Sequence, residues 1–308
     1  MKINFTKEQE KYVCDNYYNK TSSKLAKELN CTKSKITNTW YKNNLKGKQK
    51  RIYSLNESYF DIIDSEDKAY FLGFIASDGC IYKSETINKS NIVKITIHKK
   101  DIDVLEKFKT YIQTEKPINY FNGKYVTLEL VSNKLVSSLN NLNLNTCKTY
   151  GNTIPNIDNK FMKDFIRGYF DGDGSISFRN NFFDVAVRIS GYENNLTKII
   201  NYLESRNIFS SFLIDNRKYT TTNTGNFGQL VFSNKTNKYS FLKLIYGDAS
   251  VYMNRKKSLS DNFISRIELD GRVSHKEIII YYNYAVCKEN WIIYRLLLGK
   301  IGGVLLLS

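Results

Sequence analysis

The sequence has few of the residues that build transition-metal sites or disulfide scaffolds. Among its 308 residues there are only two histidines, His98 and His275, too few for a metal centre made of imidazoles. Its five cysteines lie far apart and form no C-x-x-C pair, which argues against a zinc site and against a disulfide framework. Any bound metal is therefore expected to be a hard cation held by oxygen ligands.

The sequence also lacks a recognisable signal peptide or membrane span. Residues 1–12 are polar and charged, unlike the apolar stretch of a signal peptide. Residues 291–307 are apolar, but they contain Arg295 and Lys300 and fall short of a spanning length. We therefore expect a protein that is not secreted and that works in the cytoplasm of a bacterium or phage host, or in an organelle.

Acidic residues are scarce relative to basic ones. Lys and Arg total 46 against 30 Asp and Glu, which gives a net charge of +16. An excess of this size indicates a polyanionic partner, and nucleic acid is the usual one. The codon bias of an AT-rich genome would explain many lysines, but not so large an excess of base over acid.

One short segment occurs twice. Residues 71–81 read FLGFIASDGCI, and residues 166–176 read IRGYFDGDGSI. An internal duplication predicts two copies of one supersecondary unit. The identical residues share an offset of 95 positions (173 − 78 = 95) and are Gly73, Asp78, Gly79 and Ile81 with Gly168, Asp173, Gly174 and Ile176.

Periodicity predicts a similar order of elements in each copy. The expected fold class is α+β, with two pseudo-symmetric αββαββα repeats that form a saddle for DNA. Each repeat is an antiparallel sheet with helices on one face, and the other face is polar and basic. Helical spacing is found over 65–77, 101–114, 132–142, 161–172 and 193–206. Alternating apolar residues or strand-rich runs lie over 92–98, 125–131, 175–179, 184–190, 211–218 and 227–233.

Residues 6–45 are expected to form a small helical unit. Thr6 and Gln9 have the spacing of a capping box, and two further helices begin near Thr21 and Thr32. The pattern resembles a helix-turn-helix module, whose last helix enters the DNA major groove. The alternative is an ordinary three-helix unit with a solvated basic face. The residues expected to face DNA are Lys33, Lys35, Thr37, Asn38 and Lys42.

These observations divide the chain into a series of domains. The expected parts are a helix-turn-helix-like module (1–46), a basic linker (47–63), a first repeat (64–150), a second repeat (151–264) and a tail without an assigned role (265–308).

Small residues in the repeated segment predict a close helix pair. On each helix they lie four positions apart, on one face, where they let another backbone approach closely. They are Gly73 and Ser77 on the first helix and Gly168 and Gly172 on the second. The glycine after each helix, Gly79 or Gly174, suits a left-handed helix cap.

The aspartates at the helix ends indicate chemistry rather than packing. Asp78 and Asp173 meet the negative end of a helix dipole, and they would also repel each other if brought together. A divalent cation offsets both penalties, so the pair is predicted to bind Mg²⁺. A plain Asp-Gly turn is the alternative for either copy alone, but its recurrence at one offset argues against it.

The paired segments resemble the motifs of the LAGLIDADG homing endonucleases in their single-chain, two-motif form. The resemblance covers residues 64–264, and FIRGYFDGDGSI at 165–176 is its most specific part. It implies that a monomer hydrolyses both strands of a long double-stranded DNA target with divalent metal. By position in the motif, Asp78 and Asp173 would be the catalytic, metal-binding acids. A lysine near each scissile phosphate is also implied, at Lys148 and Lys256.

The two copies differ in ways that predict unequal cutting of the two strands. Ala76 stands where the second motif has Asp171, for which we expect a supporting role at most, and the aspartate-to-lysine spacings also differ. Residues on the outward strand faces are predicted to read DNA, together with the loop 216–218. They are Lys94, Thr96, Ser177, Arg179, Arg188 and Ser190.

Two other functions share this scaffold. One is an RNA-splicing maturase that binds intron RNA, and the other is a DNA-binding regulator without catalysis. The retained aspartate pair argues against the regulator, which has no need of a metal. The helix-turn-helix-like module favours duplex DNA, because A-form RNA hides its major groove.

Overall fold

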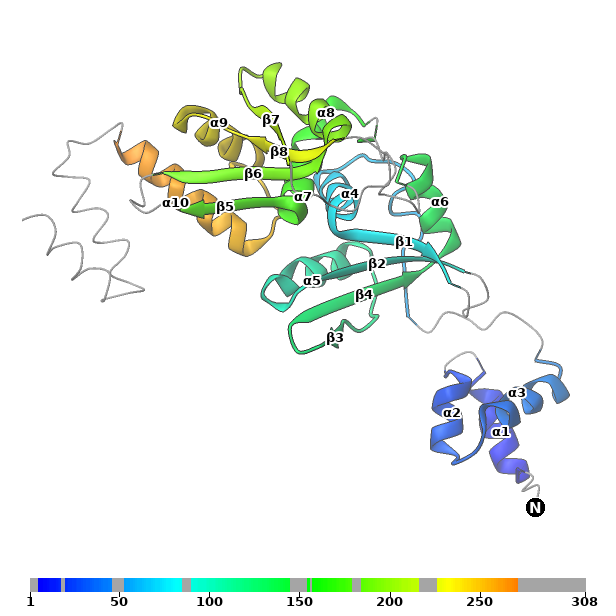
Figure 1. Cartoon of the computed structure of the whole chain (residues 1–308). Coiled ribbons are helices and arrows are strands. Elements are labelled where there is room, and N and C mark those ends of the chain that lie inside the picture. The colour runs from blue at the N-terminus through cyan, green and yellow to red at the C-terminus, as the bar shows by residue number, and fades with distance from the viewer. Residues whose placement is uncertain are drawn as a thin grey trace, which may run out of the picture. The chain divides into compact units, whose positions relative to one another are not determined.

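The computed structural model describes residues 5–17, 20–45, 53–84, 90–144, 154–155, 157–178, 184–215 and 226–270. Lys148, Arg179, the loop 216–218 and most of the tail lie outside these residues. The chain divides into two compact units, one of residues 1–57 with 109–117 and one of residues 58–108 with 118–308 (Figure 1). Within the described residues, no helix is both long and apolar enough to span a membrane.

The N-terminal unit contains three short helices, each begun by a threonine cap. The Thr6 hydroxyl accepts from the Gln9 amide at 3.2 Å, and the Gln9 side chain accepts from the Thr6 amide at 3.1 Å, which confirms the capping box. The Thr21 and Thr32 hydroxyls cap the next two helices by accepting from the Lys24 and Lys35 amides. The helices are α1 (Lys7–Asp15), α2 (Ser22–Glu28) and α3 (Lys33–Lys42).

A small core holds these helices together. The Trp40 indole donates to the Val13 carbonyl at 3.0 Å and packs edge-on against Tyr17. Between α2 and α3, Asn30 has a positive φ of 46°, and the Cys31 amide bonds back to the Ala26 carbonyl at 2.8 Å. Asparagine tolerates this backbone conformation, so the turn between α2 and α3 is sharp.

The second unit contains two halves with the same order of elements, which confirms the predicted αββαββα repeats (Figure 1). The first half consists of α4 (Glu66–Asp78), β1 (Gly79–Lys83), β2 (Asn91–His98), α5 (Ile102–Tyr111), β3 (Asn119–Phe121), β4 (Tyr125–Val131) and α6 (Asn133–Asn141). The second consists of α7 (Met162–Asp173), β5 (Gly174–Phe178), β6 (Val185–Tyr192), α8 (Glu193–Glu204), β7 (Ser211–Ile214), β8 (Phe227–Val231) and α9 (Lys235–Tyr246).

Each half has an antiparallel four-stranded sheet. The strand orders are β1-β2-β4-β3 and β5-β6-β8-β7, which are equivalent. Apolar residues pair across the strands on the inner faces, for example Ile95 with Leu128 and Ile189 with Leu230. Helix α6 contacts β2, and α8 contacts β6, β7 and β8. The α+β class expected from the sequence is therefore confirmed.

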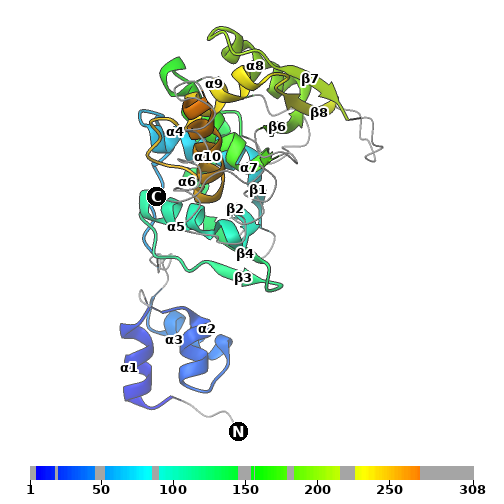
Figure 2. The same ribbon diagram turned by 90° about the vertical axis from the view of Figure 1, so that its left-hand side faces the viewer.

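Helices α4 and α7 lie between the two sheets, and their contact is the most extensive among the described elements (Figures 1 and 2). A Cβ added to Gly73 would lie 2.0 Å from the Phe165 carbonyl oxygen, and one added to Gly168 would lie 1.9 Å from the Tyr70 carbonyl oxygen. The two backbones therefore touch at these glycines, with no room for a methyl group on either side.

The glycines that end these helices are not left-handed caps, so that expectation is wrong. Gly79 has φ −73° and Gly174 has φ −88°, both extended, and each helix runs directly into a strand. Space explains the glycines instead. A Cβ on Gly174 would lie 2.4 Å from the Phe170 carbonyl oxygen, and one on Gly79 would lie 2.7 Å from the Ile75 carbonyl oxygen.

A further helix follows the second half. Helix α10 (Asn254–Asp270) packs against α9 and β5 (Figure 1). The segment that joins α9 to α10, residues 247–253, crosses to the first half: Ser250 binds Glu66 through its amide and its hydroxyl, at 2.8 and 2.7 Å. The start of α10 is therefore anchored to both halves.

Candidate active site

The two aspartates of the repeated segment end the crossed helices. Asp78 is the last residue of α4, and Asp173 is the last residue of α7. The Asp78 Oδ2 atom lies 3.3 Å from the position that a Cβ would take on Gly172, the neighbour of Asp173. Asp78 is half-buried and Asp173 is exposed. The carboxylate of one half thus lies against the backbone that carries the carboxylate of the other.

A cleft opens at this end of the helix pair, and both halves line it. The first half contributes Asp78 and strand residues from β2 and β4. The second half contributes the end of α7, the start of β5 and the start of α10. The lining includes Asp78, Thr96, His98, Tyr125, Ser175 and Lys256.

The carboxylates of Asp78 and Asp173 suit a hard cation that takes its remaining ligands from water and substrate phosphate. Within the described ranges, no group of three or more His, Cys, Asp or Glu side chains is arranged to hold a metal ion. Asp78 lines the cleft, and Asp173 is the exposed last residue of α7 beside it. Magnesium is commonly bound through one or two carboxylates, with water and substrate phosphate oxygens completing its octahedron.

Lys256 lies at the rim of this cleft with its ammonium turned into the protein. The Nζ atom donates to the carbonyl oxygens of Phe170, Asp171 and Gly174, at 2.7, 2.8 and 2.6 Å. Lys256 is only 3% exposed, and burial lowers its pKa to about 8. The lysine thus satisfies carbonyls at the C-terminal end of α7, where a positive charge also opposes the helix dipole.

Asp171 is the buried counter-charge of Lys256. Its Oδ2 accepts from the Tyr70 hydroxyl at 2.8 Å and from the Met253 amide at 2.7 Å, and its Oδ1 accepts from the Tyr246 hydroxyl. Burial raises the pKa of the Asp171 carboxyl, whereas Lys256 and the three donors oppose that rise. A buried charge of this kind is tolerated only when it is paired and hydrogen-bonded.

Two arginines form further ionic contacts, one at the start of α10 and one in the helix pair. Arg255 makes a bidentate pair with Asp101 of the first half, at 2.8 and 2.9 Å. Arg167 is fully buried and bonds Asp164, Glu66 and the Val251 carbonyl. Asp164 is three residues from Arg167 on the same helix, but Asp101, Glu66 and Val251 are far from their arginines in the sequence, and the duplication gives no sign of those contacts.

Five of the residues predicted to read DNA are described, and they lie on the outward faces of β2, β5 and β6. Arg188 and Ser177 are exposed there, and Ser190 is half-buried. Lys94 forms an ion pair with Glu129 at 3.1 Å, and the Thr96 hydroxyl lies 2.9 Å from the Thr127 hydroxyl. Both contacts join neighbouring strands of one sheet, so they order this face within the protein.

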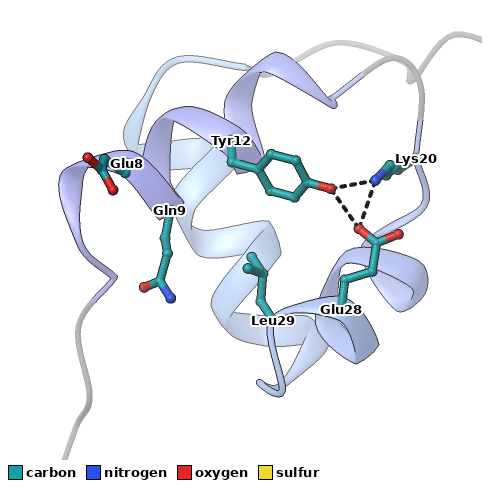
Figure 3. A pocket seen from close by; sticks show the side chains of 6 residues that line it. All are labelled: Glu8, Gln9, Tyr12, Lys20, Glu28 and Leu29. Atoms are coloured by element: carbon teal, nitrogen blue, oxygen red, sulfur yellow. Dashed lines mark hydrogen bonds and ion pairs between the residues drawn. The ribbon is translucent and has the colours of Figure 1, made fainter.

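The N-terminal unit has a separate hollow (Figure 3). The Tyr12 hydroxyl donates to Glu28 at 3.0 Å, and the Lys20 ammonium lies 2.8 Å from the same carboxylate. These contacts tie α1 to α2. On α3, Asn38 is exposed, while the Lys35 ammonium lies 4.0 Å from the centre of the Phe5 ring.

The second half matches a protein-family model described as a LAGLIDADG-like domain. The match covers residues 160–246. The match spans α7 to α9, so it includes Gly168, Gly172 and Asp173 but ends before Lys256 and α10. No curated protein sequence matches this chain.

Three solved structures with a similar fold each cover between 68% and 74% of this chain. The meganuclease I-SmaMI, bound to uncleaveable DNA, has 13% identity and a TM-score of 0.47, with 68% of this chain and 94% of that chain covered. The LAGLIDADG homing endonuclease I-GzeII, in complex with its DNA target, has 14% identity and a TM-score of 0.46, with 70% and 97% covered. The LAGLIDADG homing endonuclease I-LtrWI, bound to target DNA, has 10% identity and a TM-score of 0.45, with 74% and 98% covered.

Proposed function

We propose that this chain is a site-specific double-strand DNA endonuclease of the homing type, a hydrolase of phosphodiester bonds that uses a divalent metal, Mg²⁺. The observation that carries the proposal is the end of the α4–α7 pair. There, Asp78 lies 3.3 Å from the Cβ position of Gly172, beside Asp173. Each aspartate is the last residue of its helix, where the negative end of the dipole disfavours a carboxylate and a bound cation would stabilise it. The match of residues 160–246 to a LAGLIDADG-like domain supports the same function.

Asp78 and Asp173 would hold the metal and set its place relative to the DNA backbone. A bound Mg²⁺ ion would activate water and stabilise the charge on the leaving oxygen. Asp78 is half-buried against Gly172, so its orientation is fixed by packing. Asp173 is exposed and depends on the end of α7 for its position.

We propose that Lys256 acts in the active site by holding the backbone around Asp173. It does not act by direct contact with a phosphate. Its three protons already serve the carbonyls of Phe170, Asp171 and Gly174, on either side of Asp173. Contact with a phosphate would require it to release at least one of them. Lys148 stays the proposed counterpart in the first half.

DNA would bind along the outward faces of the two sheets, since the net charge is +16 and Arg188 is exposed there. The proposed contacts on these strands are Lys94, Thr96, Ser177, Arg179, Arg188 and Ser190. We propose that a monomer acts on the DNA, through the repeats 64–150 and 151–264. The module 1–46, with Lys35 and Asn38 on its last helix, and the linker 47–63 would extend the contact.

Cleavage of a plasmid library with randomised inserts tests this function. With Mg²⁺, the wild-type chain is expected to linearise a subset of plasmids, and sequencing of the ends gives the target. Asp78→Asn should give no linear product. Asp15→Asn, which also removes an aspartate from the end of a helix, is the control and should cut like the wild type. No cleavage by the wild type, together with tight binding to a structured intron RNA, would contradict the proposal.

A further inference from the structure

A polar contact between Tyr70 and Asp171 makes the two sides of the central helix pair different. Tyr70 on α4 donates its hydroxyl to Asp171 on α7 at 2.8 Å. At the offset of the duplication, Tyr70 corresponds to Phe165 and Asp171 corresponds to Ala76. The equivalent contact on the other side of the pair would join Phe165 and Ala76, neither of which has a polar side-chain atom.

Asp171 has partners from three separate parts of the second unit. The Tyr246 hydroxyl comes from α9, the Met253 amide precedes α10, and the Tyr70 hydroxyl comes from α4 of the first half. Its side chain is 1% exposed, so water contributes little to its solvation. The carboxylate therefore fixes the last turn of α7 to its neighbours.

The contacts of the Asp171 carboxylate hold α7 two residues before Asp173. Lys256 bonds the carbonyls of Phe170 and Asp171 before Asp173 and the carbonyl of Gly174 after it. The backbone of Asp173 is thus held from both sides by a buried Lys256–Asp171 arrangement. On α4, the corresponding position is Ala76, which offers no carboxylate to such an arrangement near Asp78.

We propose that Asp171 is a positioning residue for the Asp173 side of the active site and that it sets the ratio of the rates at which the two DNA strands are cut. This inference rests on the proposed endonuclease function. Asparagine at position 171 removes the counter-charge of Lys256 and replaces one of the two acceptor oxygens by an NH2 donor, so at least one of the three donors loses its acceptor. The end of α7 then shifts, and the Asp173 carboxylate, which α7 carries, shifts more than that of Asp78, which α4 carries.

The test uses a duplex that carries the target recovered from the plasmid library, with each strand labelled separately. The rate for each strand is measured in Mg²⁺ for the wild type and for Asp171→Asn. A displacement of about an ångström costs roughly 100-fold in rate, so the strand ratio is expected to change by at least about tenfold. Tyr70→Phe, which removes one donor, should shift the ratio in the same direction but less.

Asp164→Asn is the matched control. Asp164 is also a buried aspartate of α7, 3% exposed and paired with Arg167, but it lies in the first turn of the helix. This variant should lower stability and leave the strand ratio as in the wild type. Hydrogen exchange of the metal-free proteins gives a second readout: Asp171→Asn should speed exchange around residues 171–176, and Asp164→Asn should not.

The outcomes separate this inference from the proposed function. If the wild type cuts neither strand, the endonuclease function fails and this inference fails with it. If the wild type cuts but Asp171→Asn slows both strands equally, the endonuclease stands and Asp171 is merely structural. Should Asp171→Asn fail to fold, an unchanged strand ratio in Tyr70→Phe overturns the inference.

Discussion

Replacement of Gly168 by alanine is expected to separate the helix pair that carries the active site. The new Cβ would lie 1.9 Å from the Tyr70 carbonyl oxygen and 2.8 Å from the Phe74 amide nitrogen, both backbone atoms. Real Cβ atoms essentially never approach within 3.0 Å, so α4 and α7 must separate by about 1.1 Å (3.0 − 1.9). Side-chain rotation gives no relief, because the obstacle is backbone.

The cost follows from this separation. Overpacked cores lose about 1–3 kcal/mol and occasionally more, and a clash with backbone places Gly168→Ala at about 3 kcal/mol or above. For a unit of this size the midpoint of thermal unfolding should fall by about 6–12 °C, at about 2–4 °C per kcal/mol. Cleavage should fall further than stability, since Asp173 moves away from Asp78.

Calorimetry of the wild type and of two alanine variants measures the fall in the midpoint of thermal unfolding. Gly123→Ala is the control, because Gly123 has a positive φ of 65° and no atom within 4 Å of its Cβ position. That variant has only the left-handed backbone penalty of about 1–2 kcal/mol. The reasoning is refuted if Gly168→Ala unfolds at the wild-type temperature or costs no more than Gly123→Ala.

Three other predictions test separate parts of the account. Lys256→Met should cost about 3–5 kcal/mol in urea unfolding, because it leaves a buried charge uncompensated, and a loss below about 1 kcal/mol would contradict that. The Lys20 hydrogen bond lowers the pKa of Glu28 below 4.5, so the N-terminal unit should lose stability as the pH falls through that lowered pKa. NMR of the full chain should show that loss in the wild type and a smaller one in Glu28→Gln; equal losses would contradict the ion pair. Arg188→Ala should reduce the slope of log K for DNA binding against log salt concentration by about 0.9, as the loss of one phosphate contact requires. Lys94→Ala should reduce this slope less, because Lys94 already pairs with Glu129. A slope in Arg188→Ala equal to that of the wild type would contradict DNA binding at this face.

Periodicity predicted most of the fold because the sheets have one buried face and one outward face. The run 92–98 alternates, and it forms β2. Strand β3 (Asn119–Phe121) could not be predicted in this way, since all three residues are exposed and only pairing with β4 defines it. The capping box at Thr6 and the threonine caps of the next two helices are local features, so the sequence contained all that was needed to predict them.

The site was less accessible to sequence reasoning. The duplication identifies Asp78 and Asp173 as candidates, because two identical residues at one offset are visible in the sequence itself. The partners of Lys256 are backbone carbonyls, which have no sequence signature. The donors to Asp171 come from positions as far apart as Tyr70 and Met253, and only the folded chain brings them together.

The measurement that tests the central claim most directly is a crystal structure of the chain with its recovered target duplex and Ca²⁺. The account predicts cations in the cleft, with carboxylate oxygens of both Asp78 and Asp173 among their ligands at about 2.3–2.6 Å. Carboxylates that contact no cation while the DNA lies across the same cleft would contradict it.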